Sequence, residues 1–298
     1  HGRPYIIPHS QLAVFKKKVA RLCKLGVLER QPESEWGSPT FIIPKKSGTV
    51  RFLSDFREVN KRIIRTPFPI PKISSVLQEM EGFTYASVLD LNMGYYTIRL
   101  DPDAQKICTI ILPWGKYSYL HLPMGISSSP DFFQERMTNL METLEYVRTY
   151  IDDLLIITNG TYEDHLQKLE EVLKRLKNAG LCVNATKSSF ALHEIEYLGY
   201  ILTREGIKPQ PKKVLAILAL KEPTSVKELR KFLGMVQYYR DLWEKRSHLI
   251  APLTDLVGEC GHTKVTRKNK TKKKAWYWSK VHEDSFDKIK ECLSRDVL

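Results

Sequence analysis

The sequence predicts an α+β fold in which helices back an antiparallel sheet. Apolar and β-branched residues flank the acidic pair Asp152-Asp153, which predicts a β-hairpin over residues 147–157 with the acids at its tip. A helix is expected to begin at Ser129, because the proline that follows it suits the first turn of a helix. A second, amphipathic helix is expected over residues 161–178. Helices before and after a hairpin favour a sheet that is covered on one side by helices.

The second of these helices also shows which face it should bury. Its leucines recur at helical spacing, and Gly180 supplies an end signal after the last of them. The expected buried stripe consists of Leu166, Leu169, Leu173 and Leu176.

The N-terminal part is predicted to hold a helix and a hairpin. The helix is expected over residues 11–24 and is ended by Gly26. Residues 40–44 and 50–53 predict two strands, because both are apolar runs and a glycine-containing loop, 45–49, separates them.

From Gly206 onward the pattern becomes helical. Ser225 and Glu228 have the spacing of a capping box at a helix N-terminus, and a last helix is expected over residues 283–294. Residues 264–274 carry seven basic residues and no acidic one, so we expect a disordered or mobile loop. Such a loop would add non-specific affinity for nucleic acid or resemble a nuclear-import signal.

Composition narrows the classes of protein. The chain has 298 residues, enough for two or three subdomains, and its 47 basic and 34 acidic residues give a net charge of +13. This charge favours a polyanionic partner, nucleic acid above all, over a basic protein without one. The five cysteines form no CxxC pair, which indicates reduced, intracellular thiols. No apolar run approaches the length of a membrane span.

A third carboxylate gives the acidic hairpin a chemical interpretation. Asp90 ends the apolar run Ser87-Val88-Leu89, where an unneutralised acid would be costly. Beside Asp152 and Asp153 it would form a three-carboxylate cluster, whose mutual repulsion a divalent metal relieves. Two metals about 3.5–4 Å apart are typical of polymerases and nucleases that transfer phosphoryl groups. A solvated Asp-Asp turn is the alternative for the hairpin alone.

A set of motifs now points to a family. The chain resembles the polymerase region of a reverse transcriptase, most closely those of gypsy-type long-terminal-repeat retrotransposons and their retroviral relatives. The resemblance covers nearly the whole chain. Its motifs, in chain order, are Trp36-Gly37-Ser38-Pro39, Ile43-Pro44-Lys45-Lys46, Asp55-Phe56-Arg57-Glu58-Val59-Asn60-Lys61, Phe68-Pro69-Ile70-Pro71, Leu89-Asp90-Leu91 with Gly94-Tyr95-Tyr96, Leu122-Pro123-Met124-Gly125 with Phe133-Gln134, Tyr150-Ile151-Asp152-Asp153, Tyr197-Leu198-Gly199-Tyr200 and Phe232-Leu233-Gly234.

The resemblance implies a right-hand polymerase with fingers, palm and a helical thumb. In the family an RNase H domain follows, and we expect none within this chain. The implied division is fingers 1–65 and 98–128, palm 66–97 and 129–204, thumb 205–257, and a basic linker with the start of a connection segment over 258–298.

The resemblance also implies the site residues. Asp90, Asp152 and Asp153 would be catalytic, and together with the carbonyl group of Leu91 they would bind two Mg²⁺ ions, which Mn²⁺ could replace. The deoxynucleoside triphosphate would contact Lys45, Lys46, Arg51, Leu91, Tyr95 and Met124. Arginine suits that role because its planar fork grips phosphate oxygens.

Further roles follow from the same resemblance. Tyr95 would be the sugar gate that blocks a 2′ hydroxyl, although a core aromatic is the alternative and fits Tyr96 at least as well. The primer grip would be Leu198, Gly199 and Tyr200. Met124 departs from the Gln of retroviral enzymes, which puts nucleotide contacts there in doubt. Ser188 stands where many relatives have Cys, and we expect no catalytic consequence.

The implied function is RNA- and DNA-directed DNA synthesis. Its partners would be an RNA template, a DNA primer or RNA–DNA hybrid, and deoxynucleoside triphosphates, with no membrane. The expected location is cytoplasmic, in virus-like particles, with access to the nucleus. Nothing in the sequence indicates the oligomeric state.

Three alternatives remain open. A domesticated or inactive relative would only bind nucleic acid. An RNA-dependent RNA polymerase would be expected to carry Gly-Asp-Asp at the hairpin and no gate aromatic. A nuclease would not need the Arg51 hairpin.

Overall fold

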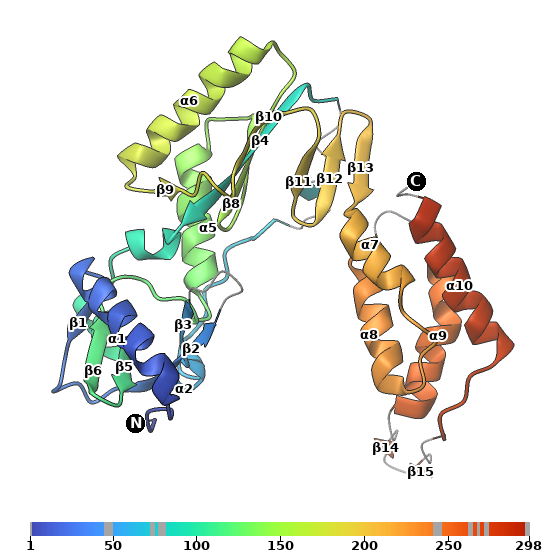
Figure 1. Cartoon of the computed structure of the whole chain (residues 1–298), viewed down its shortest axis with the longest axis horizontal. Coiled ribbons are helices and arrows are strands. Elements are labelled where there is room, and N and C mark those ends of the chain that lie inside the picture. The colour runs from blue at the N-terminus through green and yellow to red at the C-terminus, as the bar shows by residue number, and fades with distance from the viewer. Residues whose placement is uncertain are drawn as a thin grey trace. The chain divides into compact units, whose positions relative to one another are not determined.

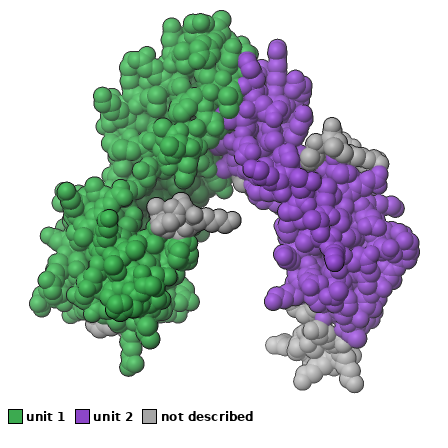
Figure 2. All heavy atoms as spheres, in the orientation of Figure 1, with its two compact units in different colours: residues 1–72, 84–192 green, residues 73–83, 193–298 purple. Residues whose placement is uncertain are grey.

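The structure is a computed structural model, and it divides the chain into two compact units (Figures 1 and 2). The first unit comprises residues 1–72 and 84–192, and the second comprises residues 73–83 and 193–298. The residues that the structure describes are 2–44, 50–71, 75–76, 82–240, 246–261, 265–266, 269–270 and 274–295.

One half of the first unit is a five-stranded sheet with order β1-β6-β5-β2-β3. Its strands are β1 (Leu28–Arg30), β2 (Ser38–Pro44), β3 (Val50–Ser54), β5 (Thr109–Leu112) and β6 (Gly115–Tyr119). The pair β2–β5 is parallel and the other pairs are antiparallel. The expected hairpin of two strands is therefore present as β2 and β3. The short helices α2 (Arg57–Asn60) and α4 (Pro102–Ile107) lie in the connections.

Helix α1 (His9–Lys24) covers this sheet and confirms the first predicted helix. It buries Phe15 and Leu22 in a core that β3, β5 and β6 also supply. The helix ends as expected, because Gly26 adopts φ 68° and its N–H bonds to the carbonyl of Cys23 at 3.0 Å.

The other half of the first unit is the predicted α+β layer (Figure 1). Its main sheet has the order β10-β4-β8-β7, and β9 pairs with the end of β4. The strands are β4 (Tyr85–Asn92), β7 (Val147–Tyr150), β8 (Asp153–Thr158), β9 (Cys182–Val183) and β10 (Ser189–Leu192). Helix α5 (Ser129–Met141) packs on β7, and α6 (Tyr162–Asn178) packs on β4 and β8. The 3₁₀ helix η1 (Gly94–Thr97) follows β4.

The buried face of α6 differs from the expected stripe. Leu166 and Leu173 are exposed, although both were expected to be buried. The buried positions are His165, Leu169, Val172 and Leu176. Both sets have helical spacing, so the helix turns the histidine and the valine toward the sheet and two of its leucines away from it.

His165 ties α6 to three strands at once. Its Nε2 lies 2.8 Å from Ser87 Oγ on β4, and its Nδ1 lies 2.9 Å from Thr158 Oγ1 on β8. The Ser87 hydroxyl also accepts the N–H of Ala191 on β10 at 2.9 Å. The ring is fully buried, so both contacts are needed to satisfy its nitrogens.

The second unit joins a small sheet to a group of helices (Figure 1). The sheet has the order β11 (Ile195–Tyr197), β12 (Tyr200–Thr203), β13 (Gly206–Pro209). The helical region begins after β13, past Gly206. The helices are α7 (Pro211–Leu218), α8 (Val226–Gln237), α9 (Arg246–Gly261) and α10 (Lys280–Arg295). Helix α10 corresponds to the predicted last helix and begins three residues before the predicted start at residue 283.

Two expectations for this unit need correction. Ser225 Oγ accepts the Glu228 N–H at 3.3 Å, but the Glu228 carboxylate bonds the N–H and hydroxyl of Thr224 rather than the N–H of Ser225. The capping box is therefore only half formed. Within the basic segment 264–274, β14 (Val265–Thr266) and β15 (Asn269–Lys270) pair as a short antiparallel ladder, where we expected no regular structure.

Replacing His165 by glutamine tests the buried bridge. Burial lowers the pKa of His165, so the unfolded chain takes up a proton at higher pH than the folded chain does. The stability that the neutral ring contributes is therefore present above its unfolded pKa, about 6.5, and is lost as the pH falls toward the lower folded pKa. We expect His165→Gln to lower the free energy of unfolding by about 1–3 kcal/mol at neutral pH, because a hydroxyl loses its partner.

The same variant should also lose less stability than the parent between about pH 7 and pH 5. Urea unfolding across this range measures both effects. His248→Gln, which changes an exposed histidine of α9, is the control and should follow the parent at every pH. An unchanged pH dependence in His165→Gln would contradict the assignment.

Candidate active site

Strand pairing brings the three predicted acids together. In the antiparallel pair β4–β8, Asp90 lies directly opposite Asp153. One step further, the N–H of Leu91 donates to the carbonyl of Asp152 at 2.9 Å. Residues opposite each other in such a pair project to the same face of the sheet. Acids some sixty positions apart in the chain therefore meet at one end of this sheet.

The turn that carries Asp152 is held in a strained conformation. Ile151 has φ 53°, which β-branched residues rarely adopt. Its N–H donates to Gln134 Oε1 at 2.7 Å, and Gln134 Nε2 donates to the carbonyl and the hydroxyl of Thr149 at 3.1 and 3.0 Å. Gln134, on α5, is only 1% exposed. The side-chain amide of Gln134 both donates and accepts hydrogen bonds around this one turn. These bonds fix the shape of the turn, and such support allows a strained conformation to persist.

The acids repel one another in this arrangement. Burial, then the charges of Asp153 and Asp90, raises the pKa of Asp152 to about 6. Burial and the charge of Asp90 also raise the pKa of Asp153. Lys187 opposes both effects, because its Nζ lies 3.2 Å from each carboxylate oxygen of Asp90. The cluster as a whole is short of positive charge.

The donor set fits a hard divalent cation. Asp152 Oδ1 is buried and has no hydrogen-bond partner among the residues described, so it is an oxygen free to bind a metal. However, no three His, Cys, Asp or Glu side chains in the described part of the chain are arranged to hold one ion. The ammonium group of Lys187 engages Asp90 instead. That these acids together bind a metal stays a prediction.

The predicted nucleotide-binding residues differ in whether the structure describes them and in how exposed they are. Lys45 and Lys46 lie outside the described residues. Arg51 is exposed on β3, opposite Ile43 of β2, so its guanidinium is available to a ligand. Met124 is 43% exposed.

Tyr95 lies beside the acids. It is 8% exposed and packs on Phe133 with ring centroids 5.0 Å apart. Burial, and to a lesser degree the negative charge of Asp152, raises the pKa of its phenol. Leu91 is buried one residue after Asp90 and pairs with Val183 of β9. Both positions are compatible with the predicted roles and test neither.

The predicted primer-grip residues form the tight turn between β11 and β12. Leu198 and Gly199 have φ 46° and 77°, and they separate the paired residues Tyr197 and Tyr200. Two successive positive φ values are typical of a type I′ hairpin.

The residues that follow α8 hold this turn. The hydroxyl of Tyr238 donates to the carbonyl of Leu198, and that of Tyr239 donates to the carbonyl of Gly199 at 3.4 Å. The hydroxyl of Tyr200 in turn donates to the carbonyl of Tyr238 at 2.7 Å.

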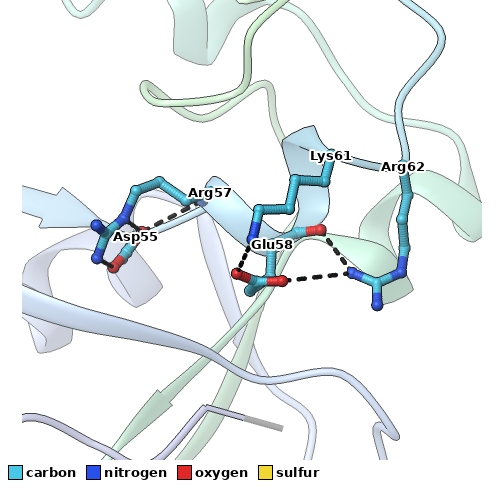
Figure 3. Close-up of polar contacts among 5 residues, drawn as sticks. All are labelled: Asp55, Arg57, Glu58, Lys61 and Arg62. Atoms are coloured by element: carbon cyan, nitrogen blue, oxygen red, sulfur yellow. Dashed lines mark hydrogen bonds and ion pairs between the residues drawn. The ribbon is translucent and has the colours of Figure 1, made fainter. Parts of the chain in front are cut away.

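Charged residues without an assigned role gather after β3 (Figure 3). Arg57 grips Asp55 with two hydrogen bonds, of 2.8 and 2.6 Å, and the pKa of Asp55 is held far below its usual value. The backbone N–H of Arg57 also donates to Asp55, at 3.2 Å, and the hydroxyl of Tyr5 donates to it at 2.7 Å. Lys61 and Arg62 both contact Glu58.

Tyr5, Asp55 and Arg57 line an open pocket of about 610 Å³ together with Phe41 and Leu53. The run from Asp55 to Lys61 is one of the motifs that carry the family resemblance, but the sequence predicted no role for it. Its only signal was the density of charge.

Comparison with known proteins gives consistent results. Residues 43–202 match the family model described as reverse transcriptase (RNA-dependent DNA polymerase). The chain is 30% identical over 293 residues to a Transposon Tf2-3 polyprotein of Schizosaccharomyces pombe, which covers 98% of the chain and 21% of that protein. It is 35% identical over 267 residues to a retrovirus-related Pol polyprotein from transposon opus of Drosophila melanogaster, which covers 86% of the chain and 26% of that protein.

Two solved structures have the same fold. One is the foamy viral protease-reverse transcriptase dRH in complex with double-stranded DNA, with TM-score 0.86, 26% identity, and coverage of 99% of this chain and 50% of that one. The other is the foamy viral protease-reverse transcriptase in complex with RNA/DNA hybrid, with TM-score 0.82, 26% identity, and coverage of 98% and 38%. The chain spans about a fifth to a quarter of the curated relatives it matches. Within the described ranges, no helix combines the length and apolar character needed to cross a membrane.

Replacing Gln134 by leucine tests how the strained turn is held. The variant keeps the bulk of the side chain but leaves the Ile151 N–H without its acceptor. We expect hydrogen exchange of the Ile151 amide to accelerate by about tenfold or more, as for a lost buried hydrogen bond, and the free energy of unfolding to fall by about 1–3 kcal/mol. Gln237→Leu, on an exposed position of α8, should change neither. An Ile151 amide that stays equally protected in Gln134→Leu would show that another group holds the turn.

Proposed function

The chain belongs to the reverse transcriptase (RNA-dependent DNA polymerase) family, and we propose that it copies RNA and DNA templates into DNA. In this reaction the 3′ hydroxyl of a primer attacks the α-phosphate of a deoxynucleoside triphosphate, and pyrophosphate leaves. The observation that carries the proposal is the pairing that sets Asp90 opposite Asp153, with Asp152 in the adjoining turn. A cluster of carboxylates short of positive charge is what metal-assisted phosphoryl transfer requires.

We propose that two Mg²⁺ ions, or Mn²⁺ in their place, are the resident cations. When bound, they would lower the pKa of the primer hydroxyl and stabilise the charge that develops on the departing phosphates. Asp90 and Asp152 would hold both ions, while Asp153 and the Leu91 carbonyl would support them. Asp152 Oδ1 favours this assignment, because it is buried without a partner.

The remaining residues would position the nucleotide. Arg51 would grip the triphosphate through its planar guanidinium, with Lys45 or Lys46 assisting. The ring of Tyr95 would lie under the sugar and exclude a 2′ hydroxyl. Support for this last role is that its buried ring lies in η1, directly after the strand that carries Asp90, and that the charge of Asp152 acts on its phenol. Met124 would contact the nucleotide through apolar surface only. Most of the rate acceleration would come from positioning and charge stabilisation.

We propose an RNA template, a DNA primer or RNA–DNA hybrid, and deoxynucleoside triphosphates as partners. The net charge of +13 supports a polyanionic partner, and the similar foamy viral structures hold double-stranded DNA and RNA/DNA hybrid. The exposed Arg57, fixed by Asp55, could contact phosphate, and Leu198, Gly199 and Tyr200 would contact the primer. A protein that only binds nucleic acid is the alternative, but it would have no need for the acid cluster.

The division into subdomains is part of the proposal. The first unit has two separate hydrophobic cores. One core draws all its buried residues from 1–65 and 98–128, the proposed fingers. The other, with the exception of Leu122, draws them from the proposed palm, 66–97 and 129–204. The thumb would be 205–257, and 258–298 would begin a connection segment. Since the curated relatives are transposon polyproteins, we propose cytoplasmic particles as the location, with access to the nucleus.

Replacing Asp152 by asparagine tests the activity. Extension of an oligo(dT) primer on poly(rA) with Mg²⁺ should fall by at least about 100-fold, because the amide cannot supply the anionic oxygens. Asp255→Asn, which changes an exposed acid of α9, should extend the primer like the parent. Equal synthesis by Asp152→Asn and the parent would contradict the proposed function.

Replacing Tyr95 by valine tests the sugar gate. A smaller side chain leaves room for a 2′ hydroxyl, so the preference for deoxynucleotides over ribonucleotides, measured as a ratio of kcat/KM values, should fall by at least about tenfold. The ratio is insensitive to any loss of folded protein. Tyr96→Val, which removes the ring stacked on Tyr119, is the control and should keep the parent's preference. An unchanged ratio in Tyr95→Val would show that residues other than Tyr95 select the sugar.

A further inference from the structure

The backbone of Asp90 lies in a gap between two strands. On one edge of β4, Tyr85 to Asp90 pair with β8. On the other edge, β10 pairs as far as Val88, and β9 begins to pair only at Leu91. Because the N–H of Leu91 faces β8, the N–H and carbonyl of Asp90 face this gap. The backbone groups of the acid are therefore left without strand partners on that side.

A loop of residues 184–188 fills the gap. The N–H of Asn184 donates to the carbonyl of Asp90 at 2.8 Å. The hydroxyl of Ser188 accepts the N–H of Asp90 at 3.1 Å and donates to the carbonyl of Asn184 at 2.9 Å. One hydroxyl thus connects both ends of the loop to the backbone of the acid.

The loop is rigid enough to act as a fixed support. The N–H groups of Lys187 and Ser188 both donate to the carbonyl of Asn184 at 3.1 Å. Thr186 Oγ1 donates to Asn184 Oδ1 at 2.8 Å. The position of the Ser188 hydroxyl is set by these bonds, so it can in turn set the position of Asp90.

We propose that Ser188 is a positioning residue for Asp90: its hydroxyl replaces the missing strand partner and fixes the carboxylate for metal binding. The inference rests on the proposed function. Only two side-chain torsions separate the carboxylate of Asp90 from its backbone. A shift of the backbone therefore moves the carboxylate with it. We expected no catalytic consequence from serine at this position, and its contacts with Asp90 change that expectation.

The substitutions separate positioning from simple structural support. Ser188→Ala removes the hydroxyl, Ser188→Thr keeps it, and Ser188→Cys replaces it by a thiol, which is a weak donor and acceptor. Ser189→Ala is the matched control, because Ser189 is the adjacent residue and its hydroxyl makes no described contact with Asp90. All variants are compared in the full chain.

The main readout is Mn²⁺ binding, titrated by electron paramagnetic resonance without nucleic acid, with Asp152→Asn as the reference that lacks the site. Groups that support metal ligands typically contribute 10–100-fold to affinity, so we expect Ser188→Ala to weaken binding by about tenfold or more. The affinity of Ser188→Thr and of Ser189→Ala for Mn²⁺ should match that of the parent. The affinity of Ser188→Cys should lie between those of Ser188→Ala and the parent. In primer extension, Ser188→Ala should lower kcat and leave KM for the nucleotide unchanged, because Ser188 is not among the residues proposed to bind the nucleotide.

Two results would overturn the inference. One is Mn²⁺ affinity in Ser188→Ala equal to that of the parent. The other is a lower melting temperature of Ser188→Ala with no change in its metal affinity or kcat. That result would mean that the hydrogen bond between Ser188 and Asp90 only stabilises the fold. Absence of primer extension by the parent would instead contradict the proposed function, and the comparison of Mn²⁺ binding would still decide the role of Ser188.

Discussion

The antiparallel pairing of β4 with β8 is the constraint on which the site depends. It sets Asp90 opposite Asp153, and a shift of one residue would turn Asp90 to the other face of the sheet. Apolar packing secures this pairing, since Leu89, Leu154 and Ile156 are fully buried in the core that α5 and α6 complete. His165 adds a polar connection between α6 and the two strands. The apolar core thus supplies the free energy that holds like charges together.

Each acid also has local support of its own kind. Gln134 holds the strained turn before Asp152, and the 184–188 loop holds the backbone of Asp90. Lys187 balances part of the negative charge in this structure. Burial raises the pKa of Asp152 most, and repulsion from Asp153 and Asp90 adds to it. In the proposed metal complex, divalent cations would replace Lys187 at Asp90 and would relieve that repulsion. Both effects support the proposal that this site binds metal.

Short-range patterns in the sequence predicted the elements of this site, and long-range contacts explain what was missed. Flanking apolar and β-branched runs predicted the hairpin around Asp152, the proline after Ser129 predicted the start of α5, and helical spacing predicted α6. The buried face of α6 was wrong, because leucines occur on two sides of the helix and the sheet selects the face that carries His165. Gln134 and Ser188 matter through partners 17 and 98 positions away, which no local pattern reveals.

The central claim is that Asp90 and Asp152 converge on a common pair of metal ions. A crystal structure with Mn²⁺, a primer-template and a non-reactive nucleotide, with anomalous diffraction from manganese, tests it most directly. We expect two peaks about 3.5–4 Å apart, contacted by both carboxylates, with Lys187 displaced from Asp90. Manganese bound elsewhere, with Asp90 still paired to Lys187 and turned from Asp152, would contradict the account.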